Sequence, residues 1–133
     1  MNPQYPAVAQ RARRRCEYCH APEAIFNFPF EVEHVVPTAL GGSDDLSALA
    51  LACRSCNLFK SDAIEATDPE TEQLCRLFDP RQDLWEEHLR VNQESAEVEG
   101  LTPIGRATAT RLQMNRPAQL AARLLWLRLG LFE

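Results

Sequence analysis

Two short cysteine motifs constrain the fold of this chain more than any other part of its sequence. Each has the form Cys-x-x-Cys: the first pair is Cys16 and Cys19, and the second is Cys53 and Cys56. Two cysteines with this spacing can bind one metal ion from a single tight turn, and four thiolates are the ligand set of a closed tetrahedral zinc site. We therefore predict that these four residues bind one structural zinc ion.

Two other roles for these cysteines stay open. They could be reduced structural residues, or a redox pair, although neither motif follows the βαβ pattern of thioredoxin-like proteins. His20 directly follows Cys19 and could replace a cysteine as a ligand, or could be a solvent-exposed histidine. The fifth cysteine, Cys75, is expected to be a small, half-buried apolar residue.

The length and the apolar pattern favour an intracellular protein. The chain has 133 residues, which suits one compact domain or one domain with a short extension. Residues 1–15 contain no apolar run of the kind found in a signal peptide. No stretch approaches the roughly 20 apolar residues that cross a membrane. We therefore expect a cytoplasmic protein without a membrane partner.

The charge is unevenly distributed along the chain. The formal net charge is −5, but arginines gather at both ends and acidic residues in the middle. Binding to a polyanion requires a local positive patch rather than a positive total, so the net charge does not exclude nucleic acid as a partner. The run Arg13, Arg14 and Arg15 fits either an arm that contacts DNA or a solvated helix end.

The periodicity of the first half indicates short elements around the cysteine motifs. Residues 30–36 alternate apolar and polar side chains, as expected for a half-buried strand that ends at Pro37. Glycines then mark a loop. Residues 46–52 form an apolar run that fits a strand or a helix, and a helix is predicted from Asn57 to about Ala66.

The second half is predicted to contain a hairpin and two helices. Residues 67–83 are rich in turn-forming and acidic residues, and residues 84–99 fit a hairpin with a break near residue 92. A helix should begin at Thr102-Pro103, since threonine can cap and proline tolerates the first turn. A second helix, with an apolar stripe, should follow Pro117 and end near Gly130.

The dipeptide Glu33-His34 lies between the two cysteine motifs, where the predicted strand ends. Histidine titrates near neutral pH and can accept a proton from water, whereas a carboxylate can bind a hard cation such as Mg²⁺. Taken alone, the pair would be read as a surface histidine beside a surface glutamate.

The residues around this pair resemble the HNH endonucleases. The resemblance rests on Cys-x-x-Cys, Glu-His-x-x-Pro, Gly-Gly-Ser-x-x-Leu and Leu-x-Cys-x-x-Cys-Asn-x-x-Lys in this order. In addition, the segments LFDPRQDLWEEH and GLTPIGRATATRLQMNRP resemble the C-terminal extension of one subgroup. The matching residues of the core are Cys16, Cys19, Glu33, His34, Pro37, Gly41, Gly42, Ser43, Leu46, Leu51, Cys53, Cys56, Asn57 and Lys60.

The resemblance implies an α+β fold with a ββα-metal core over residues 1–66, braced by the zinc site. Residues 67–133 would form an extension of a hairpin and two helices, packed on that core. His34 would be the general base in hydrolysis of phosphodiester bonds in nucleic acid, with DNA as the expected substrate. Glu33 and Asn57 would bind a catalytic Mg²⁺ or Mn²⁺ ion. Arg54 and Lys60, with the arginines of residues 13–15, are the expected contacts to the phosphate backbone.

One position departs from the family pattern. The middle asparagine of the family falls at Ala48, and that asparagine braces the loop behind the catalytic histidine through backbone hydrogen bonds. Alanine cannot make these bonds, so the sequence predicts a less well held His34 and a gain in cleavage on Ala48→Asn. The alternative is a zinc module with weakened or lost catalysis that binds nucleic acid or a protein. A purely structural zinc domain is a third reading, but it leaves Glu33, His34 and Asn57 without a shared purpose.

Overall fold

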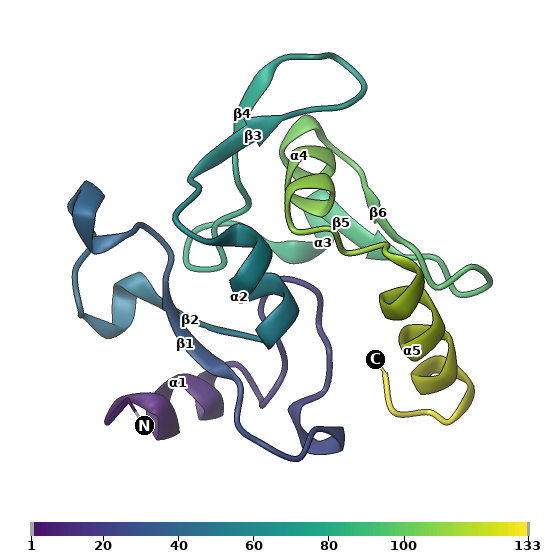
Figure 1. The fold of residues 1–133 in the computed structure, drawn as a ribbon, viewed down its shortest axis with the longest axis horizontal. Coiled ribbons are helices and arrows are strands. Elements are labelled where there is room, and N and C mark those ends of the chain that lie inside the picture. Colours follow the sequence, from purple (N-terminus) through teal and green to yellow (C-terminus); the bar gives the residue numbers. More distant parts are fainter. Residues whose placement is uncertain (1, 133) are drawn as a thin grey trace.

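A β-hairpin and one helix form the centre of the first half of the molecule. The computed structural model describes residues 2–132. Strands β1 (Glu31–His34) and β2 (Leu49–Ala52) pair antiparallel, with His34 opposite Leu49. Helix α2 (Arg54–Lys60) follows β2 almost at once and packs on both strands (Figure 1). All four residues of β2 are buried, which is why its sequence is a continuous apolar run rather than an alternating one.

Helix α1 (Tyr5–Arg11) also packs against the hairpin. Proline in its first turn favours the start of a helix, and Val8 and Ala9 are fully buried. The chain leaves α1 through Arg13 and Arg14, both in a left-handed backbone conformation, and enters the first cysteine motif. Arg13 and Arg14 are exposed, and Arg15 forms an isolated antiparallel bridge with Pro22.

Short 3₁₀ helices occupy the connections on either side of β1. The first is η1 (Glu23–Ile25), and the loop from β1 to β2 contains η2 (Thr38–Leu40) and η3 (Leu46–Ala48). This loop is compact at Gly42, where an added Cβ atom would lie 1.8 Å from the carbonyl oxygen of Val36. Only glycine allows the backbone to approach so closely.

The second half contains two further hairpins and three helices within the described residues. The elements are β3 (Glu65–Thr67), β4 (Leu74–Arg76), α3 (Trp85–His88), β5 (Leu89–Val91), β6 (Val98–Gly100), α4 (Pro103–Arg111) and α5 (Pro117–Arg128). Helix α4 packs against both hairpins, and α5 lies beside the first half of the chain near α2 (Figure 1).

The predicted α+β class is confirmed, but several boundaries differ. Helix α2 ends at Lys60 rather than near residue 66, because Ser61 has φ 51° and ψ −128° and cannot continue a helix. Strand β3 follows after a short turn and includes both residue 66 and residue 67, while the division of the chain at this point stays a prediction. The start of the predicted hairpin at 84–99 is instead helix α3. Thr102 caps α4 as predicted, accepting a hydrogen bond from the backbone of Gly105.

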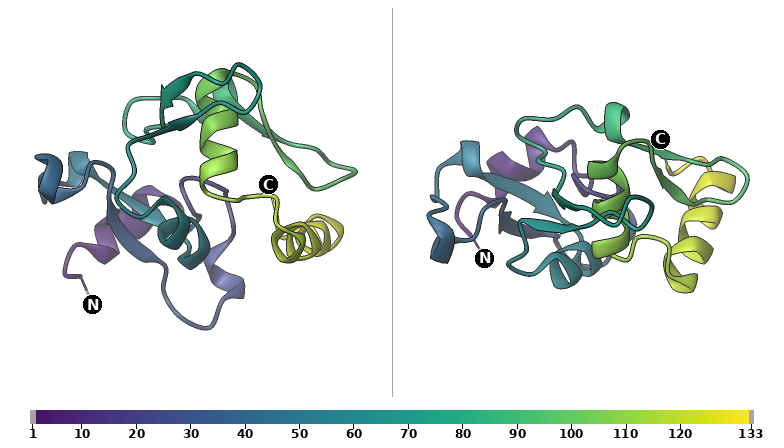
Figure 2. Two further views of the ribbon diagram at one scale, coloured as in Figure 1. Left: turned by 45° about the horizontal axis from the view of Figure 1, so that its top comes forward. Right: turned by 90° about the horizontal axis from the view of Figure 1, so that it is seen from above.

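Both halves share one cluster of buried side chains, to which Leu51, Phe78, Leu89 and Leu112 belong. The loop between β1 and β2 and helix α5 lie at opposite ends of the molecule (Figure 2). In residues 2–132 no helix combines the length and the apolar character needed to cross a membrane.

Candidate functional site

The four cysteines of the two motifs converge on one point. Cys16 and Cys19 come from the turn after α1, while Cys53 and Cys56 lie at the start of α2, and their four Sγ atoms lie within 4.8 Å of one another. The Sγ atoms of Cys19 and Cys53 are 3.7 Å apart. Zinc–sulfur bonds of about 2.3 Å in a tetrahedron place sulfurs roughly 3.8 Å apart. The cluster therefore fits a zinc ion with no further ligand.

The backbone at each motif is arranged for sulfur ligands. The amide of Cys19 donates to Sγ of Cys16, and the amide of Cys56 donates to Sγ of Cys53, which also caps α2. Hydrogen bonds among the four thiols, first of all with Cys16, lower the pKa of Cys53 and raise the pKa of Cys19 and Cys56. Four thiolates this close together would repel one another, and a bound divalent ion would offset that repulsion.

Glu33 points from β1 into the space between the hairpin and α2. The hydroxyl of Tyr18 donates to its Oε1 atom, and the ammonium of Lys60 lies 3.2 Å from its Oε2 atom. The side chains of Glu33 and Lys60 are only 5% and 2% exposed. Burial raises the pKa of the Glu33 carboxyl and the positive charge of Lys60 opposes this shift, while burial beside Glu33 raises the pKa of Tyr18.

Lys60 has a second partner, the carbonyl oxygen of Val35, 3.0 Å from its ammonium. One carboxylate oxygen and one carbonyl oxygen therefore surround a cation at the C-terminal end of α2. These are the donor types that hard cations such as Mg²⁺ prefer. The sequence predicts Lys60 as a contact to phosphate. Its ammonium is buried inside the domain, and the phosphate contact stays a prediction.

His34 lies on the opposite face of β1 from Glu33, because successive side chains of a strand alternate. Its imidazole is 29% exposed, and its Nε2 atom lies 2.7 Å from Oδ1 of Asp44 in the loop between β1 and β2. A carboxylate only accepts hydrogen bonds, so in a neutral imidazole this contact selects the tautomer with a proton on Nε2. The Nδ1 atom then carries the lone pair.

Asn57 lies in the middle of α2, three residues before Lys60 and therefore on the same side of the helix. It is half-buried. Glu33 and Lys60 thus meet between the hairpin and α2, and Asn57 lies on the adjoining face of α2. His34 lies on the other face of β1, where it contacts the loop between β1 and β2, and is not part of this group.

The predicted nucleic-acid contacts do not form one continuous row. Arg13 and Arg14 are exposed after α1, and Arg14 forms an ion pair with Glu23 at 3.2 Å. Arg15 is half-buried. Arg54 is exposed at the first residue of α2, at the end of this helix opposite Lys60.

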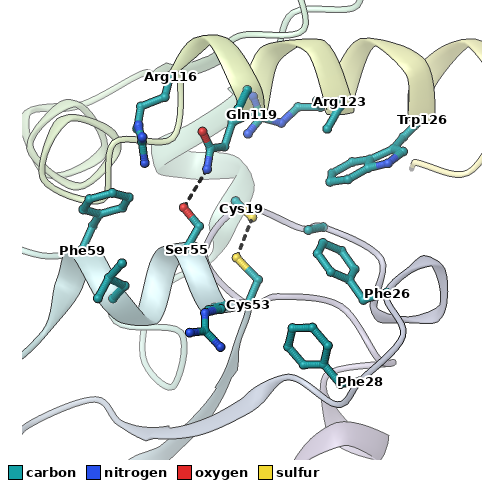
Figure 3. A pocket seen from close by; sticks show the side chains of 15 residues that line it. Cys19, Phe26, Phe28, Cys53, Ser55, Phe59, Arg116, Gln119, Arg123 and Trp126 are labelled. Atoms are coloured by element: carbon teal, nitrogen blue, oxygen red, sulfur yellow. Dashed lines mark hydrogen bonds between the residues drawn. The ribbon is translucent and has the colours of Figure 1, made fainter.

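A largely apolar groove lies between α2 and α5, away from the loop that carries Asp44. Its volume is about 400 Å³. Phe26, Phe28, Phe59 and Trp126 line it, and Arg116 stacks over Phe59 at 4.9 Å (Figure 3). None of the predicted catalytic side chains lines this groove.

Tyr18 and Asp44 were not among the residues predicted for the site. Tyr18 lies inside the first cysteine motif, and the spacing of this motif predicts a role only for its two cysteines. Asp44 belongs to a glycine-rich loop in which an aspartate is an ordinary solvated residue. No local pattern marks either one, because each acts through a contact with a residue of β1 more than nine positions away.

The comparison with protein families agrees with the fold. Residues 16–63 match the family model described as HNH endonuclease, so an HNH domain spans just over a third of the chain. The predicted resemblance is thereby confirmed for this segment, which contains both cysteine motifs, β1, β2 and α2. The resemblance of the C-terminal segments to one subgroup stays a prediction. No curated protein and no solved structure matches the chain.

Proposed function

We propose that this HNH domain is a metal-dependent endonuclease that hydrolyses phosphodiester bonds in nucleic acid, with DNA as its substrate. The observation that carries this proposal is the partial exposure of the His34 imidazole together with its contact to Asp44. The imidazole lies at the end of β1, and Asp44 holds its Nε2 atom. A histidine held in this way has its Nδ1 lone pair available to take a proton from water.

The side chains around His34 and those around Glu33 have different proposed roles: proton transfer and metal binding. Asp44 orients the His34 ring and stabilises the imidazolium that forms once a proton is taken. Glu33 and Asn57 are the residues that would bind Mg²⁺ or Mn²⁺. Glu33 would bind the ion through the Oε2 atom that now faces the ammonium of Lys60, so the ion and this ammonium would compete for one carboxylate. When bound, the ion stabilises negative charge on the phosphate and on the leaving oxygen.

The zinc site has a different part in the proposal. Its four thiolates leave no open position for a substrate, so it braces the turn after α1 against the start of α2. The unpaired state of its cysteines fits a reducing compartment, and we propose the cytoplasm.

Contacts with the phosphate backbone are assigned to the positive residues near the hairpin. Arg13, Arg14 and Arg15 follow α1, and Arg54 begins α2. Lys60 stays outside this set in the resting protein, because its ammonium is buried against Glu33 and the carbonyl of Val35. Such contacts set affinity and orientation but not base specificity.

The test is nicking of supercoiled plasmid by zinc-loaded protein in the presence of Mg²⁺ or Mn²⁺. His34→Ala should lower the rate by about 100-fold or more, which is the usual contribution of a general base. His88→Ala is the matched control and should leave the rate unchanged, because His88 contacts Thr102 and lies outside the segment that matches the family model. A His34→Ala protein that cleaves as fast as the parent contradicts the proposed base.

A second candidate function is a zinc module that binds nucleic acid or a protein without cleaving. The observation that favours it is the complete engagement of Glu33 by Tyr18 and Lys60. Parent protein that retards DNA in a gel but cleaves no substrate with any divalent metal would support this second function over the first.

A further inference from the structure

The loop between β1 and β2 lacks the asparagine that the HNH pattern places at residue 48, where this chain has alanine. The loop is nevertheless well connected around this residue. The amide of Val35 donates to the carbonyl of Ala48 at 3.0 Å, and the amide of Ala48 donates to the carbonyl of Asp45 at 2.8 Å. Alanine contributes only its backbone here, so side-chain bonds to the loop must come from elsewhere.

Arg11, the last residue of α1, reaches this part of the loop. Its Nη1 atom donates to the carbonyl of Leu46 at 2.7 Å, and its Nη2 atom donates to the carbonyl of Leu49 at 2.6 Å. The two carbonyls lie on either side of Ala48. A guanidinium has its donors in a fixed planar fork, so it can hold two carbonyl groups at a set separation.

The two carbonyls that Arg11 holds are linked to the catalytic histidine. Leu49 lies directly opposite His34 in the pairing of β1 with β2. Leu46 begins the 3₁₀ helix that follows Asp44 and Asp45. Fixing both carbonyls therefore fixes the strand partner of His34 and the end of the loop that supplies Asp44.

Arg11 itself is exposed, but the helix that it ends is held in place by the fold. Val8 and Ala9 of α1 are fully buried, which anchors the helix beneath the hairpin. Burial and the positive charge of Arg81 lower the pKa of Arg11, whereas Glu17 raises it. The guanidinium still keeps its charge, since an arginine pKa starts above 12.

We propose that Arg11 is a positioning residue that replaces the missing asparagine and holds the loop of His34 from helix α1. This inference rests on the proposed nuclease function for its catalytic consequence, but the brace itself is a property of the resting protein. It also revises the expectation from the sequence alone: with Arg11 in place, Ala48→Asn should change cleavage by less than twofold in the parent.

The first experiment does not depend on whether the protein cleaves nucleic acid. Hydrogen exchange of the Val35 amide is measured by NMR in zinc-loaded protein without other divalent metal. Arg11→Ala should speed this exchange by about tenfold or more, because the carbonyl of Ala48 that holds the amide becomes mobile. Arg90→Ala, which removes an exposed arginine from β5, is the control and should leave the exchange unchanged. Unchanged exchange in Arg11→Ala overturns the proposal, whether or not the parent cleaves DNA.

The second experiment measures plasmid nicking. Arg11→Ala should lower kcat by roughly 10- to 100-fold, the range that a misplaced catalytic group can cost, with KM close to that of the parent. Arg11→Lys keeps the charge but cannot bridge two carbonyls, so its kcat should also fall. This variant serves as the test if Arg11→Ala does not fold. Ala48→Asn should restore kcat in either Arg11 background.

The outcomes separate the brace from other roles of Arg11. A rise in KM with unchanged kcat would make Arg11 a phosphate contact and overturn the proposal. Failure of Ala48→Asn to restore kcat would show that Arg11 does not replace the asparagine, which also overturns it. A parent that cleaves no substrate removes the proposed function, and the exchange measurement then decides the brace alone.

Discussion

Lys60 gives the sharpest test of how the candidate site is held together. It is the only lysine of the chain, and its side chain is 2% exposed against Glu33, which is 5% exposed. Lys60→Met keeps most of the apolar stem of the side chain but removes the ammonium. The Glu33 carboxylate would then be left buried with Tyr18 as its remaining hydrogen-bond donor.

The expected loss is large for a single substitution. Removing one partner of a buried ion pair typically costs about 3–5 kcal/mol, because the other charge stays buried without compensation. For a domain of this size each kcal/mol lowers the melting temperature by roughly 3 °C, so the loss corresponds to about 9–15 °C. Urea unfolding of zinc-loaded protein, checked by elemental analysis, measures the change in the free energy of unfolding.

Two further variants show whether the charge is the cause. Glu33→Leu combined with Lys60→Met replaces the pair by apolar groups and should recover most of the lost stability, since such replacements are often neutral. Arg90→Met breaks the exposed pair with Glu99 and should change stability far less. A Lys60→Met protein within about 1 kcal/mol of the parent would refute the view that this pair is dry and holds α2 to β1.

The remaining predictions concern metal, loop and nucleic acid. Cys53→Ala should lose the single zinc ion and unfold the core, read by elemental analysis and circular dichroism. Asn57→Ala should weaken Mn²⁺ binding, measured by calorimetry, without loss of zinc; unchanged affinity would remove Asn57 from the ligand set. Gly42→Ala should lower the melting temperature and the cleavage rate, because its Cβ would collide with the carbonyl of Val36. DNA affinity should fall with salt, with a log–log slope of roughly −0.9 for each phosphate contact; a flat dependence would argue against the arginine contacts.

The parts of the site that were predictable are those with a local signature. The zinc cluster follows from the spacing of Cys16, Cys19, Cys53 and Cys56, because two tight turns suffice to define four ligands. Alternation before Pro37 predicts a strand over residues 30–36, and the structure has the shorter strand β1, Glu31–His34, within this range. Both features depend on neighbours in sequence.

The parts that were missed depend on contacts across the chain. The hairpin of β3 and β4 lies in residues that carry turn signals, and its strands are stabilised by packing on α4. Arg11 contacts carbonyls 35 and 38 residues away, and Lys60 contacts a carboxylate 27 residues before it. Every residue has a backbone carbonyl, whatever its side chain. A sequence pattern therefore does not predict which carbonyls an arginine will contact.

These contacts explain together why α2 can present Asn57 from a helix of only two turns. Such a short helix is not stable alone, and its orientation must come from its ends. Cys53 and Cys56 join the first turn to the cysteine cluster, and Lys60 fixes the last residue to Glu33 and Val35. Asn57 lies between these two anchors in the sequence of α2. The cysteine cluster and the buried ion pair therefore support α2 from both of its ends.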